Sequence, residues 1–231
     1  MKQFRIAPET FDIFPHLEIG AVVLRGIDNT QGGPEAAEGL ARACAALEKR
    51  LAEAGGTLPE IQTFADAMKK FVRKKGCRAS LDAMARRIAK GDTVGSINPA
   101  VDLYNTVCLT HLFTCGGENL ARIEGDMVLG LAAGTEPFIP LGEQENAPPR
   151  PGELVYRDDA GVVVRSWVWR ESDRTKIDAG ARDILLYMEN IDPSRRGALR
   201  DALDDLYERA SLLGGERTRH LISAEQPACA L

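Results

Sequence analysis

The stretch from residue 98 to residue 126 constrains the fold of this chain more than any other. It reads NPAVDLYNTVCLTHLFTCGGENLARIEGD, so an Asn-Pro start leads into a long apolar run that breaks at a Gly-Gly pair. A helix this apolar must be buried. Its first two turns nevertheless carry Asp102, Tyr104 and Asn105, and polar groups in a core need partners, either protein groups or a ligand. The sequence therefore predicts a central helix that carries polar groups into the core.

Helical periodicity precedes this stretch, and strand-like alternation follows it. Before it we expect strands over residues 2–6, at a sheet edge, and 19–24, then helices over 34–54, 60–75 and 80–90, the last with Ser80 as its N-cap. After it we expect strands over residues 127–129, 138–139, 153–157, 162–170 and 183–188, and a last helix from residue 193. This order indicates an α+β fold with mostly antiparallel sheets flanked by helices. We expect one domain over residues 1–215 and a frayed C-terminal tail over residues 216–231.

Composition and missing motifs exclude several classes of protein. The chain has 231 residues and no apolar run near the roughly 20 residues that span a bilayer, and its N-terminus lacks a signal-peptide core, so we expect a cytoplasmic protein. Its five cysteines form no CxxC pair and its three histidines are far apart, which predicts no metal site and no disulfide scaffold. No glycine-rich phosphate loop and no GxSxG motif occurs, so we expect neither nucleotide-triphosphate binding nor a nucleophilic triad.

A basic cluster stands out because the net charge of the chain is −5. One interpretation is a solvated surface in which cations favour a helix C-terminus. The other is a docking site for RNA phosphates. Both interpretations stay open at this point. The residues predicted to bind RNA are Lys69, Lys70, Arg73, Lys74, Arg86 and Arg87.

Two further groups of side chains are candidates for a binding site. In the expected strand 162–170, Arg165, Trp167 and Trp169 share one face, which is either a core face or a surface that stacks on a base or an aromatic amino acid. The other group is Asp102 and Asn105 on the central helix with Glu124 after it. These polar residues either fix the adjacent loop and turn by hydrogen bonds, or bind an α-amino group and position a water.

Several sequence blocks, taken in order, resemble the B3/B4 domain of the phenylalanyl-tRNA synthetase β subunit. NPAVDLYN at residues 98–105 and NLARIEG at 119–125 are similar to that family's NPVVD and DLDKIEG blocks, and DILL at 183–186 is similar to its NIVLE strand. The wording WVWRE at 167–171 is closer to stand-alone B3/B4 proteins. The resemblance implies an α+β B3/B4 fold, tRNA as the partner, and hydrolysis of a wrongly esterified amino acid without metal or cofactor.

The chain departs from the synthetase pattern at the positions that form the editing pocket. The histidine before the DLDKIEG block is replaced by the segment 115–118, and small residues of the synthetase correspond to the tryptophan-bearing segment 166–170. The glutamate that ends NIVLE falls on Tyr187, and Glu189 lies two residues on. The resemblance therefore implies either a different substrate or a domain without hydrolytic activity.

The hypothesis that combines these observations is a stand-alone editing-type domain that acts on the 3′ aminoacylated end of tRNA. In it, Glu189 or Glu124 orients water. The residues expected to bind the substrate are Asp102, Asn105, Arg165, Trp167, Trp169 and Tyr187. The alternatives are a non-catalytic RNA-binding module and a binder of a free amino acid or small metabolite. No membrane or DNA partner is expected.

Overall fold

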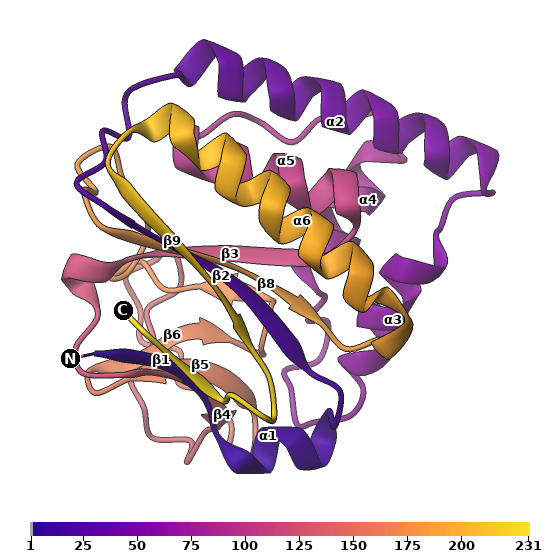
Figure 1. The fold of residues 1–231 in the computed structure, drawn as a ribbon. Helices are drawn as coiled ribbons and strands as arrows, with labels where there is room; N and C mark the ends of the chain where they lie inside the picture. The colour runs from indigo at the N-terminus through magenta and orange to yellow at the C-terminus, as the bar shows by residue number, and fades with distance from the viewer. Residues whose placement is uncertain (1) are drawn as a thin grey trace.

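The computed structural model describes residues 2–231, which form three layers (Figure 1). A layer of helices covers one face of a four-stranded sheet, and a six-stranded sheet lies on its other face. The helices are α1 (Pro8–Ile13), α2 (Gly33–Glu53), α3 (Pro59–Ala67), α4 (Ser80–Ile88), α5 (Pro99–His111) and α6 (Arg196–Arg209), with short 3-10 turns η1 (Leu120–Arg122), η2 (Pro193–Arg195) and η3 (Ala210–Leu213).

The two sheets differ in order and in direction. The four-stranded sheet is antiparallel with the order β3-β8-β2-β9, and the six-stranded sheet has the order β10-β1-β4-β5-β6-β7, with β1 and β4 parallel. The strands are β1 (Gln3–Ile6), β2 (Glu18–Arg25), β3 (Thr114–Asn119), β4 (Met127–Leu131), β5 (Leu154–Asp158), β6 (Gly161–Arg165), β7 (Arg170–Glu171), β8 (Ile184–Asn190), β9 (Glu216–Ile222) and β10 (Ala228–Ala230). The confirmed fold is thus α+β, with β3 and β7 at the ends of their sheets.

Helix α5 begins where its sequence predicts, but it ends at His111, before the Gly-Gly pair at which the sequence predicts the break. The Asn98 side chain accepts a hydrogen bond from the Val101 amide at 3.1 Å, and Pro99 occupies the first turn, where a missing N–H costs nothing. The residue after the helix, its C-cap Leu112, has a left-handed φ of 57°. Residues 99–109 are all buried, because α5 packs between the rest of the helical layer and the four-stranded sheet.

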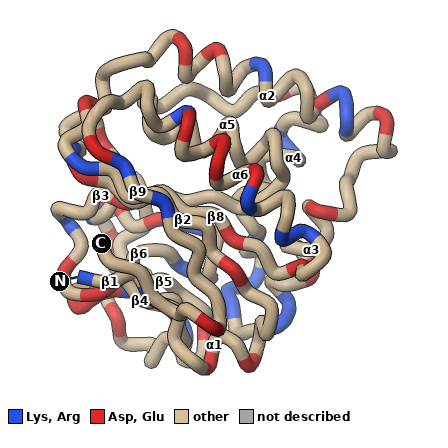
Figure 2. The backbone as a smooth tube through the Cα atoms, viewed as in Figure 1, with Lys and Arg blue, Asp and Glu red and all other residues tan. Residues whose placement is uncertain are grey.

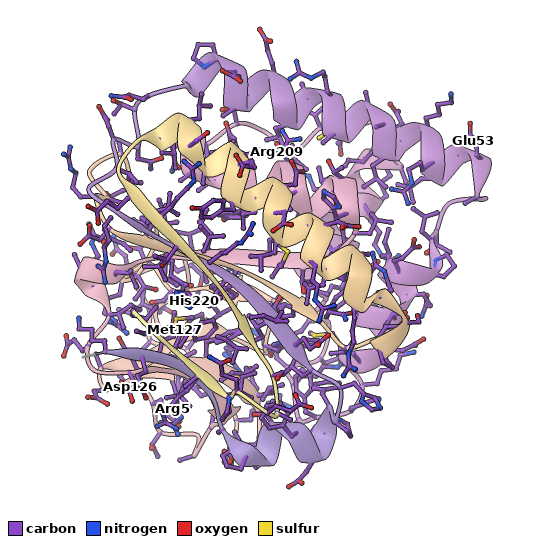
Figure 3. All side chains as sticks on the ribbon, viewed as in Figure 1. Arg5, Glu53, Asp126, Met127, Arg209 and His220 are labelled. Carbon is purple, nitrogen blue, oxygen red and sulfur yellow. The ribbon has the colours of Figure 1, made fainter. Side chains whose placement is uncertain are left out.

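Aromatic side chains join the two sheets. Phe4 of β1 and Tyr156 of β5 come from the six-stranded sheet, and Tyr187 of β8 comes from the four-stranded sheet. Their ring centroids lie 5.0–5.8 Å apart, in tilted contacts. Every residue of β8 is buried, since helices cover one of its faces and the second sheet covers the other. On the six-stranded sheet, the half-exposed Arg5 guanidinium of β1 forms an ion pair with the Asp126 carboxylate just before β4, at 3.3 Å (Figure 3).

Several predicted elements were wrong in extent or kind. Residues 114–119, expected as a break, form β3, and the predicted strand at 138–139 is loop. Helix α3 ends at Ala67, so the basic residues after it lie in a connecting segment. Ser80 is the first residue of α4 rather than its cap, since Ala79 holds that position.

The C-terminal residues and the N-terminal strand also differ from expectation. The stretch 216–231, expected as a frayed tail, adds β9 to β2 and β10 to β1. Strand β1 therefore lies inside its sheet, between β10 and β4, and not at an edge. Short-range periodicity is weak in both segments, and partners far along the chain supply their hydrogen bonds.

Among residues 2–231, no helix combines the length and the apolar character that crossing a membrane requires.

Candidate functional site

A cleft of about 300 Å³ opens where the free edges of the two sheets meet. Strands β3 and β8 form one wall, and β6, β7 and the turn between them form the other. The start of α4 and the loop before β5 complete the mouth. The lining residues are Ser80, Cys115, Gly116, Leu141, Val164, Trp167, Val168, Trp169, Arg170, Glu171, Tyr187 and Glu189.

Gly116 explains why the Gly-Gly pair belongs to a strand. A Cβ atom on Gly116 would lie 2.7 Å from the Tyr187 ring, and one on Gly117 would lie 2.8 Å from Ile177 and Leu186. Neighbouring side chains thus occupy the space over both glycines. Only a residue without a side chain fits there, so the strand carries glycine at both positions. The phenol of Tyr187 lies across Gly116 and forms part of the cleft wall.

The turn after β6 places Trp167 in the cleft wall. Ser166 and Trp167 have φ values of 49° and 61°, a left-handed conformation that costs free energy in residues other than glycine. The Trp167 ring is fully buried, with Phe14 stacked at 5.0 Å and Phe64 at 5.9 Å. It therefore both fills the core and lines the cleft. The strand predicted over 162–170 was wrong, because β6 ends at Arg165 and this turn follows.

A buried ion pair holds that turn in place. Arg165 donates to both carboxylate oxygens of Glu153, at 2.9 and 3.3 Å, and also to the Ala147 carbonyl at 2.8 Å. The Ser166 hydroxyl donates to the same carboxylate. The side chains of Arg165 and Glu153 are 6% and 0% exposed, so the pair satisfies itself inside the protein. Arg165, expected to contact substrate, thus positions the turn and does not line the cleft.

Glu189 accepts more and shorter hydrogen bonds than the other carboxyl group that lines the cleft, Glu171. It is fully buried and accepts hydrogen bonds from the Thr114 and Tyr156 hydroxyls, both at 2.7 Å. Burial raises the pKa of Glu189 from 4.5 to about 7, although these hydrogen bonds oppose the rise. At neutral pH the carboxyl group therefore exchanges readily between its acid and its base form.

Two other carboxyl groups lie at the same end of the sheets. Glu171 lines the cleft and accepts a long hydrogen bond of 3.5 Å from Tyr104, and burial raises its pKa to about 7. Glu118 lies behind Tyr187, whose hydroxyl donates to it at 3.3 Å. Burial, and after it the negative charge of Glu171, raises the pKa of Glu118 well above its usual range. Within residues 2–231, none of the three carboxyl groups forms an ion pair.

Three buried polar atoms near the cleft have no hydrogen-bond partner within residues 2–231. They are the Ser80 hydroxyl, the Trp167 indole nitrogen and one oxygen of Glu118. The indole N–H lies beside the Tyr156 hydroxyl without meeting hydrogen-bond geometry. Unpaired buried polar groups are rare because each costs free energy. A ligand in the cleft would supply acceptors or donors to them.

The structure brings some of the predicted site residues together and separates others. Glu189, Trp167, Trp169 and Tyr187 all line the cleft. Glu124 is exposed in the turn before β4, where its backbone amide donates to Asp158 at 2.8 Å and its carbonyl accepts from the Asp159 amide at 2.9 Å.

The polar residues of α5 lie outside the cleft lining. Asp102 is buried and accepts hydrogen bonds from the Ser96 hydroxyl and, at 2.9 Å, from the Ile97 amide, so it fixes the loop before the helix. Asn105 is 8% exposed on the same helix. The polar groups of the central helix that prompted a ligand hypothesis therefore mainly serve the fold, with Tyr104 as the exception through Glu171.

Four residues of this region were not predicted from the sequence: Glu118, Glu171, Thr114 and Tyr156. A strand assignment for TCGGEN would have revealed two of them, because Thr114, Gly116 and Glu118 then share a face. The register pairs Thr114 with Glu189 and Gly116 with Tyr187, which places the face beside the cleft. The glycine pair hid this alternation.

A second hollow, of about 760 Å³, lies between the end of α2, α3 and α4. Four cationic side chains line it: Arg78, Arg86, Arg87 and Lys90. Asp82 at its base pairs with Arg86 at 2.8 Å and with Arg78 at 3.7 Å. In Figure 2, several Lys and Arg segments lie below α3.

Of the predicted RNA-binding residues, Arg86 and Arg87 line this hollow, and the other four lie in the segment after α3. Lys69 pairs with Asp66 at 2.6 Å, and the Lys70 ammonium lies 5.5 Å from the centre of the Phe14 ring. Arg73 is half-buried and Lys74 is exposed in the segment between the helices. The name basic surface is used here for the cations of residues 69–90, which include Arg86 and Arg87. No group of three His, Cys, Asp or Glu side chains within residues 2–231 is placed to hold a metal ion.

Comparisons with known proteins identify the family. The family model described as the B3/4 domain matches residues 63–212. The chain therefore belongs to the B3/4 domain family, and the predicted resemblance is confirmed. A solved N-terminal fragment of the phenylalanyl-tRNA synthetase β-subunit from Pyrococcus horikoshii is similar in fold, with a TM-score of 0.50 and 12% identity. The match covers 92% of this chain and 49% of that one, so the chain spans about half of the fragment. No curated protein matches the chain.

Proposed function

We propose that this B3/4 domain hydrolyses an aminoacyl ester at the 3′ end of an RNA, with Glu189 as the general base. The observation that supports the proposal is the Glu189 carboxyl group in the cleft, whose pKa of about 7 suits a base that works at neutral pH. In the proposed reaction, Glu189 takes a proton from water while the water oxygen attacks the ester carbonyl. The C–O bond to the ribose then breaks, the ribose oxygen receives the proton, and a free amino acid leaves.

The other groups of the cleft fit the remaining tasks of this reaction. The unpaired Ser80 hydroxyl is a donor available to the acyl oxygen, whose negative charge grows during attack. Trp167 and Tyr187 offer flat apolar walls for the acyl side chain, and Glu171 offers an acceptor for the α-ammonium group. An ester is already activated, so positioning by such groups supplies much of the rate.

The basic surface suits the RNA part of the substrate. Helix α4 connects it to the cleft, because Ser80 at its start lines the cleft while Arg86 and Arg87 near its end line the second hollow. A helix of nine residues is about 13 Å long at 1.5 Å per residue. A strand of a few nucleotides can therefore contact the cations through its phosphates while its 3′ end enters the cleft.

The test is a deacylation assay with a panel of mischarged tRNAs and micromolar protein. We expect release of at least one amino acid, with a rate that rises between pH 6 and pH 8 and is half-maximal near pH 7, because only the ionised carboxylate accepts the proton. Glu189→Gln should lower the rate by about 10²–10⁴-fold. Glu124→Gln, which changes an exposed carboxyl group outside the cleft, is the matched control and should leave the rate unchanged. No release from any pair would overturn the enzymatic proposal.

A further inference from the structure

The two tryptophans of the chain have different surroundings in the wall of the cleft. Trp167 is fully buried and packs on Phe14 and Phe64. Trp169 lines the same cleft but is only partly buried. In the proposed reaction Trp167 contacts the acyl side chain, and Trp169 has no assigned contact. Because its ring is partly open to solvent, Trp169 is within reach of the part of a ligand that projects out of the cleft.

The Trp169 ring is held in place from the protein side. The guanidinium of Arg165 lies over this ring, 5.9 Å from its centroid, in an attractive contact between a cation and an aromatic face. Arg165 is buried and is itself fixed by its hydrogen bonds to Glu153. Since the cation comes from the buried side, the partly exposed side of the Trp169 ring stays available to a ligand.

An exposed apolar side chain lines the cleft together with Trp169. It is Leu141, which comes from the loop before β5 and is 41% exposed. The Leu141 amide donates to the Glu171 carbonyl at 2.9 Å, and the next amide, that of Gly142, donates to the Asp173 carboxylate at 3.1 Å. The loop is therefore fixed to β7 and to the residues after it. An aromatic ring and an apolar side chain held at one opening suit a flat, apolar group.

A cation at the same opening favours a nucleotide as the owner of that flat group. Arg170 lines the cleft and pairs with Glu143 at 2.7 Å, and the two side chains are 39% and 46% exposed. An ion pair this exposed contributes little to stability, so the guanidinium can exchange the carboxylate for a phosphate, which it binds through two parallel hydrogen bonds. Proteins hold unpaired nucleotides with this combination of an aromatic ring and a cation.

We infer that Trp169 stacks on the 3′-terminal base of the RNA, with Leu141 beside the base and Arg170 on the phosphate of that nucleotide. The inference rests on the proposed function, because the ester joins the acyl group to the ribose of this nucleotide and so keeps its base within one nucleoside of Glu189. It adds the part of the RNA that the cleft recognises. Trp167 then contacts the acyl group and Trp169 the base. Every base has a π-face, so the contact depends on the presence of a base more than on its identity.

The test uses two RNA stem-loops with a single-stranded 3′ end, which are identical except that one lacks the base of its last nucleotide. Neither carries an amino acid, so fluorescence anisotropy with the full chain measures binding and not hydrolysis. We expect the RNA with the terminal base to bind about tenfold more tightly, as stacking of one base on an aromatic side chain contributes. Equal binding would leave Trp169 to the acyl side chain and overturn the inference. Tighter binding of the RNA without the base, or no binding of either RNA at 100 micromolar protein, would also overturn it.

Variants locate the ring that holds the base. Trp169→Ala should bind the two RNAs equally, and its retained affinity for the RNA without the base shows that the variant is folded. Trp169→Phe should keep most of the preference, because an aromatic face remains. Ile97→Ala, which removes an exposed apolar side chain outside the cleft, is the matched control and should keep the full preference. A preference that survives Trp169→Ala would contradict the assignment.

The outcomes separate this inference from the proposed function. A preference for the terminal base without hydrolysis of any ester would overturn only the proposed reaction. Hydrolysis together with equal binding of the two RNAs would overturn only the role of Trp169.

Discussion

The cleft and the basic surface differ in how far their charged side chains are exposed to solvent. In the cleft, Glu189 is fully buried and Glu171 is half-buried, and burial raises the pKa of each to about 7. On the basic surface, Lys69 and Arg86 stay in contact with solvent and pair with the carboxylates of Asp66 and Asp82. In the cleft, burial therefore decides whether a carboxyl group is charged. On the basic surface, screening by the solvent weakens the interactions of the charged side chains.

The two regions also differ in how the chain builds them. The basic surface comes from one continuous segment, residues 69–90, so a local count of cations found it. The cleft comes from strands far apart in sequence, β3, β6, β7 and β8, together with the first residue of α4. Its properties depend on burial and on register, and the predictions below test that dependence.

The largest effect is expected from Trp167→Ala. The Trp167 ring is fully buried against Phe14 and Phe64, so its removal leaves a cavity and should lower the free energy of unfolding by about 3–5 kcal/mol. Trp169→Ala is the matched control, because Trp169 is only partly buried, and its loss should be clearly smaller. Urea unfolding at pH 7 measures both. An equal loss of unfolding free energy in the two variants would contradict the description of Trp167 as a core residue that also lines the cleft.

The second effect is a dependence of stability on pH. The pKa of Glu189 is raised in the folded state, so the folded protein binds more protons than the unfolded chain between about pH 4.5 and pH 7. Stability from this group is therefore fully present at low pH and is lost as the pH rises towards and through 7. The loss between pH 5 and pH 7.5 should be on the order of 2–3 kcal/mol for this carboxyl group.

Glu189→Gln isolates that contribution, because glutamine does not titrate. The wild-type protein should lose more stability than the variant between pH 5 and pH 7.5, as measured by urea unfolding at a series of pH values. Glu124→Gln should follow the wild-type curve. Parallel curves for wild type and Glu189→Gln would contradict the raised pKa and weaken the role of Glu189 as a base.

The smallest effect is expected on the basic surface. Reversal of charge at Lys70, Arg73 and Lys74 to Glu should weaken tRNA binding by at least tenfold, about 1.4 kcal/mol, and flatten the dependence of affinity on salt. The slope should fall by about one for each lost phosphate contact. Filter binding over a range of salt concentrations measures this.

Charge reversal at Arg42 and Lys49 provides the control for RNA binding. Both residues are exposed on α2 and pair with glutamates one turn away on the same helix. Their reversal should change affinity far less than reversal on the basic surface. Equal losses would mean that RNA binding follows net charge alone, and unchanged binding in both variants would remove the basic surface from the proposal.

Part of the fold followed from short-range signals. The Asn-Pro signal and the apolar run beyond it predicted α5, because these features act within a few residues. A short continuous apolar run predicted β2, and a proline near the start, helical spacing and closing glycines predicted α2. The basic residues and both tryptophans were also apparent, since their significance depends on composition and spacing alone.

The remaining features depended on partners that short-range patterns do not reveal. TCGGEN forms β3 because Tyr187 and Leu186 of β8 occupy the space over its two glycines. The last residues form β9 because β2 offers them a free edge. For Asp102 the sequence left two interpretations open, a role in fixing the adjacent loop and a role in binding a ligand, and its hydrogen bonds to the loop before α5 support the first.

The sequence by itself determined the α+β class, the central helix, the basic segment and the B3/4 family. The tertiary structure decided which residues form the cleft, because strand register brings Glu189 beside Thr114 and a left-handed turn carries Trp167 into the wall. It also decided what those residues can do. The pKa of a carboxyl group depends on its surroundings in three dimensions, and burial between two sheets gives Glu189 a pKa near 7.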